Sequence, residues 1–125
     1  MLSLQNNIVH LIPHDVKTIL GIEQEIANFQ LALQGDLSKY ARKNIGKLIE
    51  LKQYVLNCAR CDVCAVQDMG NLHQQIVVLE SSLNELRNVQ PVDVDQLTKK
   101  TVLLTLLKDS YRECIFWMRK NQPNL

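Results

Sequence analysis

The chain has 125 residues, of which 46% are apolar and 22% charged, so its length and composition are those of one soluble globular domain with a buried core. Its 14 basic and 13 acidic side chains leave a formal net charge of +1, which excludes a bulk electrostatic attraction for nucleic acid. Aromatic residues make up only 5%, too few for the exposed rings on which single-stranded nucleic acid stacks. Nucleic acid is therefore not the expected partner, and any such role must be local.

The first predicted element is a short helical segment over residues 1–13. Four apolar residues between positions 4 and 12 recur near helical spacing, and Pro13 follows them. Because proline disfavours the helical conformation of the residue before it, we expect this segment to end at Pro13.

A second helix is predicted from His14 or Asp15 to Gly35. Either of the first two residues can cap a helix start, and glycine is common just after a helix end. Between these limits, apolar residues repeat in steps of three and four, as one buried face of a helix requires. These residues are Ile19, Ile22, Ile26, Phe29 and Leu33.

The most informative feature is an apolar stripe from Leu37 to Leu86, which advances in alternating steps of three and four residues and contains only two polar members, Asn44 and Asp62. A period of 3.5 residues keeps one face of a helix turned toward a neighbour, so the stripe predicts helix rather than strand. Unbroken, this helix would be about 80 Å long and would protrude as a coiled-coil rod. A break at Gly70–Asn71 is slightly favoured because glycine suits a helix end, although the stripe keeps its phase across that point.

The last helix is predicted to begin at Pro91, with Asp93 or Asp95 near its start, and to end where residues 122–125 form a flexible tail. Both this helix and the stripe have apolar faces wider than the two positions per heptad of a two-stranded coil. Wide faces and short connections predict an all-α fold. We expect residues 1–125 to form one antiparallel bundle of about four helices.

Three cysteines, Cys58, Cys61 and Cys64, have the spacing that zinc knuckles use. They lie within a strong helical pattern, however, where positions i and i+6 point about 120° apart, so one straight helix cannot aim all three sulfurs at one ion. We therefore expect no metal and no cofactor, with the cysteines packed as small apolar side chains. A zinc-stabilised helical bundle stays open as an alternative.

Four basic residues, Lys39, Arg42, Lys43 and Lys47, lie on one side of a predicted helix. Such a strip can bind phosphates or an anionic surface, with an affinity that falls as salt is added. A run of basic residues more often serves only as the hydrated face of an amphipathic helix. Binding of nucleic acid or of an anionic surface through this strip is therefore an alternative and not the preferred hypothesis.

The start of the chain has neither the basic stretch nor the continuous apolar run of a secretory signal, and the apolar runs elsewhere are too short to cross a bilayer. The four cysteines also fit a reducing compartment. We expect an intracellular protein, cytoplasmic or nuclear, without a transmembrane segment.

The sequence has no glycine-rich phosphate loop, no recognisable serine, histidine and acid arrangement and no paired Glu-x-x-His motifs, so we expect neither an enzyme nor a small-molecule substrate. The main hypothesis is a protein–protein interaction or oligomerisation module, a scaffold or small subunit that docks through helix faces, with a homodimer as one form. The residues expected to contact the partner are Leu72, Ile76, Leu79, Leu83, Phe116 and Trp117.

Overall fold

The computed structural model of the chain consists of helices joined by short connections. It describes residues 2–60 and 65–121, with side chains from residue 17 onward. Its elements are α1 (Leu2–Ala32), α2 (Lys39–Ala59), α3 (Ala65–Asn88) and α4 (Val94–Asn121), and no strand occurs within these ranges. The predicted all-α fold with about four helices is confirmed.

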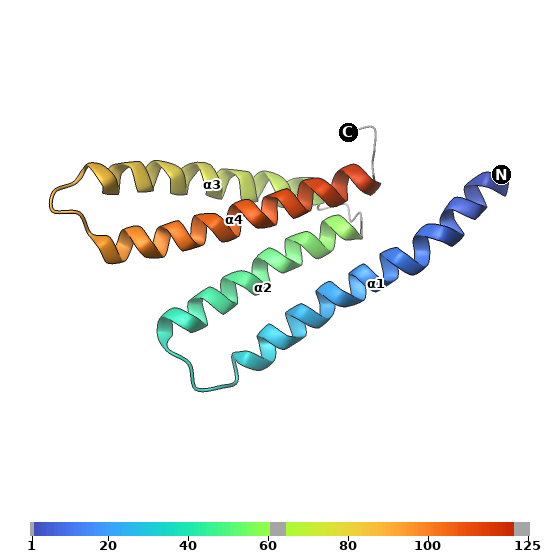
Figure 1. The fold of residues 1–125 in the computed structure, drawn as a ribbon, viewed down its shortest axis with the longest axis horizontal. Helices are drawn as coiled ribbons and strands as arrows, with labels where there is room; N and C mark the ends of the chain where they lie inside the picture. The colour runs from blue at the N-terminus through green and yellow to red at the C-terminus, as the bar shows by residue number, and fades with distance from the viewer. Residues whose placement is uncertain (1, 61–64, 122–125) are drawn as a thin grey trace.

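Each helix runs opposite to the one before it, so the chain forms two antiparallel hairpins, α1–α2 and α3–α4 (Figure 1). The hairpins are joined mainly through α2 and α4, which pack on each other as extensively as the helices within each hairpin do. The backbones of α2 and α3 approach each other at fewer places, and in the described part of the chain α1 packs on α2 alone. The bundle is therefore open, with α1 at one edge.

The core is built from the apolar positions that recur at steps of three and four along each helix. That spacing places one side of each helix against its neighbours, and burial of this side removes apolar surface from water. Side chains from all four helices join one buried cluster. Its members include Ile22, Ile26, Leu51, Val55, Cys58, Leu72, Ile76, Leu107, Cys114 and Met118.

α1 continues through Pro13, so the predicted end of a helix at that residue is wrong. Proline holds its φ angle near −65°, which a helix accepts, and its local cost is one lost backbone hydrogen bond together with crowding of the preceding turn. In a helix of 31 residues the flanking turns supply enough backbone hydrogen bonds to carry the helix across this defect. The predicted 1–13 segment and the second predicted helix are one element.

The long apolar stripe is broken, but the predicted break at Gly70–Asn71 is wrong, and so is the uninterrupted rod. α2 ends at Ala59, where the backbone N–H of Arg60 still donates to the Leu56 carbonyl at 2.9 Å, and α3 begins at Ala65 and passes through Gly70. The stripe keeps its phase because its members on both sides of the connection are buried in the same core. An exposed glycine inside a helix costs only about 1 kcal/mol, less than neighbouring buried leucines contribute.

Side chains define the starts of two helices. Ser38 caps α2, since its Oγ accepts a hydrogen bond from the Ala41 N–H at 3.1 Å. At the start of α4 the Asp93 carboxylate accepts a hydrogen bond from the Gln96 N–H at 3.1 Å, as expected for one of the two aspartates predicted there. The predicted tail at 122–125 lies outside the described residues.

Candidate protein-binding surface

Four of the residues predicted to contact a partner belong to the interior of this chain. Leu72, Ile76 and Leu83 are buried, and Leu79 is half-buried against the core cluster. The side chains of Leu72, Ile76 and Leu83 pack within the folded chain, so a partner could reach these three only if helices separated. The prediction that these positions form an apolar contact face is sound, but the structure corrects their assignment to another chain, because α4 covers α3 from within the same molecule.

The other two predicted residues, Phe116 and Trp117, lie near the C-terminal end of α4. The Phe116 side chain is 57% exposed, whereas Trp117 is half-buried and packs against the core. The two rings meet edge to face with centroids 5.0 Å apart, and the Lys120 Nζ lies 4.8 Å from the centroid of the Trp117 ring. Trp117 thus supports the aromatic ring that α4 presents to solvent.

The first turns of α3 lie near the last turns of α4 (Figure 1). Side chains of both segments line an open apolar groove. A hollow of about 290 Å³ there is lined by residues of both helices, and a second, of about 460 Å³, adjoins it along α4. Val66 is 62% exposed within this region. We call this surface the α3–α4 groove, and its residues are Val66, Met69, Ile115, Phe116, Met118 and Arg119.

Basic side chains border the α3–α4 groove. Arg112, Arg119 and Lys120 line the hollow along α4 together with Phe116. Arginine and lysine near the end of α4 also interact favourably with the negative end of the helix dipole. The Glu113 carboxylate, on the same helix, points away to the Lys52 ammonium at 3.3 Å. The Asp109 carboxylate pairs with Arg112 at 3.4 Å. The groove is therefore apolar, and its lining along α4 has a net positive charge.

The predicted basic strip is not one continuous binding surface. The Arg42 guanidinium donates to the carbonyls of Leu33 and Gly35 at 2.8 and 2.9 Å, which satisfies acceptors after the end of α1. Lys47 is engaged between α2 and α3, while Lys39 and Lys43 are exposed. Two members of the strip thus have structural contacts, which sequence spacing does not reveal.

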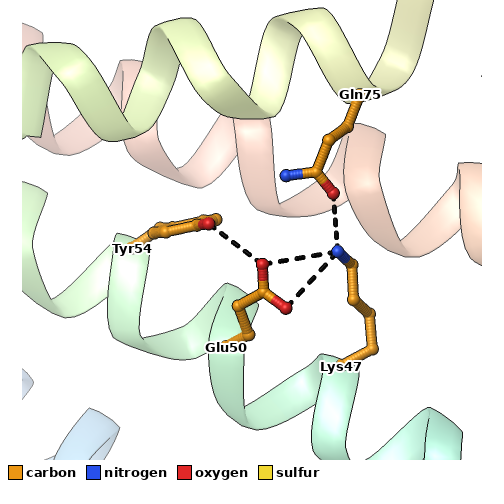
Figure 2. Close-up of polar contacts among 4 residues, drawn as sticks. All are labelled: Lys47, Glu50, Tyr54 and Gln75. Atoms are coloured by element: carbon orange, nitrogen blue, oxygen red, sulfur yellow. Dashed lines mark hydrogen bonds and ion pairs between the residues drawn. The ribbon is translucent and has the colours of Figure 1, made fainter. Parts of the chain in front are cut away.

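Lys47 belongs to a polar network that links α2 to α3 (Figure 2). Its Nζ donates to the Gln75 Oε1 at 2.5 Å and pairs with the Glu50 carboxylate at 3.4 Å. The Tyr54 hydroxyl donates to the Glu50 Oε1 at 3.0 Å, and burial together with this carboxylate raises the pKa of Tyr54. Each of the four residues in Figure 2 makes at least one polar contact with another of them, so the network serves to orient the two helices.

Of the predicted weak zinc ligands, only Cys58 lies in the described part of the chain; Cys61 and Cys64 are outside it. Cys58 is a fully buried free thiol on α2 and shares a hydrogen bond with the equally buried Cys114 of α4. This hydrogen bond and burial raise the pKa of Cys114 well above its usual range. Within residues 17–60 and 65–121 no three His, Cys, Asp or Glu side chains gather as metal ligands would.

Comparison with protein-family models, with curated proteins and with solved structures found no match to this chain. None of the helices, over the residues that the structure describes, combines the length and apolar character that a membrane crossing requires. The surfaces of the chain itself therefore indicate what it can bind. Of these, the α3–α4 groove brings together exposed apolar side chains, a hollow and a local charge.

Proposed function

We propose that this protein is a non-enzymatic protein-binding module whose α3–α4 groove holds an acidic amphipathic helix of another protein. The observation that carries the proposal is the exposed Phe116 ring beside a two-helix hollow with a basic border. The module would act as a scaffold or as a small subunit of a larger assembly.

The apolar centre of the groove supplies the affinity in this proposal. Covering a large apolar side chain such as Phe116 contributes about 1.5–3 kcal/mol, and an aromatic residue next to a hollow is the usual form of an interface hot spot. Ile115 lines both hollows, and Val66 lines the adjoining one from α3. Two antiparallel helices leave a groove between their ridges into which side chains of a third helix fit.

The charges decide which helix binds. Arg112, Arg119 and Lys120 line the hollow along α4, so they favour a partner with carboxylates next to its apolar stripe. A second copy of this chain on the same face would set these cations against the same cations across a two-fold axis. The occupant is therefore a different protein, and its binding weakens as salt is added.

The proposal is tested with two synthetic helical peptides of about 18 residues that share one leucine stripe and differ only in having Glu or Lys beside it. Amide NMR spectra of the labelled full chain are recorded during titration with each peptide. The acidic peptide should shift amides at the start of α3 and the end of α4, and the basic peptide should not. Equal shifts with both peptides, or shifts confined to other regions, contradict the proposal.

Two variants make the test specific. Phe116→Ala should weaken binding of the acidic peptide about tenfold or more, and Arg119→Glu should abolish its preference over the basic peptide. The matched control is Val78→Ala on α3, because Val78 is 58% exposed, like Phe116, and does not line the groove. Loss of affinity in the control that equals the loss in Phe116→Ala would also contradict the proposal.

A further inference from the structure

The side of α1 that faces away from α2 is a second apolar surface, independent of the α3–α4 groove. α1 buries Ile22 and Ile26 against the core, and in the described residues it has no other helix as a neighbour. On its outer side Leu20 is 58% exposed and Leu31 is 69% exposed. Leucines this exposed on an edge helix leave apolar surface that a further helix would cover.

These leucines belong to a regular stripe. Leu20, Gln24, Ala27 and Leu31 follow one another in steps of four, three and four residues, and all four are exposed. This spacing keeps them on one side of the helix and is the repeat of a coiled-coil contact. Gly21, next to the stripe, and Ala27 within it are small, so another helix can approach α1 closely.

The charge around the stripe differs from the charge of the α3–α4 groove. On this side Gln24, Asn28 and Gln30 are uncharged, and Lys17, seven residues before Gln24, adds one positive charge that the antiparallel pair described below would set against Gln34 and not against its own copy. The Glu23 carboxylate pairs with the Arg60 guanidinium at 2.9 Å, and Glu25 pairs with Lys52 on the α2 side. An almost neutral face can meet its own copy without repulsion, which the basic groove cannot.

We propose that a second copy of this chain packs on α1 and that the two α1 helices run antiparallel about a two-fold axis. The stripe is symmetric about the point between Glu25 and Ile26. Leu20 and Leu31 lie at equal distances on either side of this point, and so do Gln24 and Ala27. An antiparallel pair centred there places Leu20 of each chain against Leu31 of the other, and Gln24 against Ala27. Every position of the stripe then has a partner.

We expect the dimer to be weak because its interface is small. Stable specific interfaces bury at least about 1,200 Å², and one pair of helices buries less. The fraction of dimer therefore depends on protein concentration. This inference does not depend on the proposed function, since it uses no residue of the α3–α4 groove. Both surfaces can be occupied together.

The test is sedimentation velocity of the full chain over a hundredfold range of concentration up to about 1 mM. The weight-average mass should rise toward twice that of one chain, and Leu20→Glu should keep it at one chain throughout. Val78→Glu is the matched control, because Val78 is also 58% exposed, and it should dimerise like the original chain. A constant mass of the original chain, or a dimer that Leu20→Glu leaves intact, overturns the proposal.

A double variant tests the direction of the pair. Leu20→Glu combined with Leu31→Lys sets opposite charges against each other twice in the antiparallel dimer, so it should recover dimer that either single variant loses. In a parallel dimer like charges would face each other, and the double variant would stay monomeric. That result overturns the antiparallel arrangement. Circular dichroism should show unchanged helicity in all variants, because the substituted side chains are exposed.

Discussion

The two sides of α2 hold the molecule together by different means. Toward α4, the buried thiols of Cys58 and Cys114 are in contact within the apolar core. Toward α3, long polar side chains bridge the gap, as in the 2.6 Å hydrogen bond from Asn57 Nδ2 to Asp68 Oδ2. Apolar burial contributes most of the free energy of folding, whereas polar bridges replace bonds to water and contribute mainly orientation. α2 therefore depends for its stability more on α4 than on α3.

The largest effect is expected from a truncation in the core on the α4 side. Leu107 is 1% exposed, so Leu107→Ala should lower the free energy of unfolding by about 2–5 kcal/mol through lost burial and a residual cavity. Urea unfolding followed by circular dichroism measures the change. Val78→Ala, an exposed position, serves as control and should change stability by less than about 0.5 kcal/mol. If Leu107→Ala lowered the free energy of unfolding by less than Val78→Ala does, Leu107 would not lie in a packed core.

A smaller effect is expected on the α3 side. Gln75→Ala removes the acceptor at 2.5 Å from the Lys47 Nζ, and the lysine keeps its ion pair with Glu50. The free energy of unfolding should fall by about 1 kcal/mol, which is the usual net worth of one hydrogen bond. The same urea experiment applies. If Gln75→Ala cost as much as Leu107→Ala, the contrast between the two sides of α2 would disappear.

At Lys52 the electrostatic contribution to the free energy of unfolding can be measured by changing the pH. Burial alone lowers the pKa of Lys52, but the carboxylates of Glu113 and Glu25, on α4 and α1, together raise it above the ordinary 10.5. A folded pKa above the unfolded one means that the stabilisation is complete below the unfolded pKa and is lost as pH rises through the folded pKa. Lys52→Met should therefore cost about 0.5–1 kcal/mol at pH 7.

The measurement is the difference in unfolding free energy between the original chain and Lys52→Met at neutral pH and above about pH 11. Because other groups titrate equally in both proteins, their contributions cancel in this difference. The gap should close at high pH. A gap that persists there would show that the lysine acts through its hydrocarbon chain and not through its charge.

The smallest effect is a gain in stability on α3. Gly70 lies inside the helix, and a Cβ added to it meets nothing within 4 Å. Gly70→Ala should raise the free energy of unfolding by about 0.5 kcal/mol, because alanine loses less backbone entropy in a helix. Thermal and urea unfolding measure this gain in stability. The contacts of α2 should not change. A loss of stability instead would mean that the backbone at Gly70 departs from the helix.

Local sequence signals identified individual residues wherever the physical cause is local. The helix start at Asp93 follows from a side chain that bonds a backbone N–H three residues later. The roles of Arg42 and Lys47 could not be predicted in this way, since their partners, two carbonyls just after α1 and Gln75 on α3, are brought near only by folding. The same holds for the α3–α4 groove, of which the sequence indicated Phe116 but not Val66 or Met69.

Helical structure and the buried side of each helix follow from the order of residues alone, because a period of 3.5 residues is a property of neighbouring residues on one helix. What covers those sides depends on how the helices pack. Leu72 and Leu83 have the same apolar pattern whether they pack on α4 or on another chain, and the choice depends on where the chain turns back. The turn lies before Ala65 and not at Gly70, because burial of whole helix faces outweighs the local preference of one glycine.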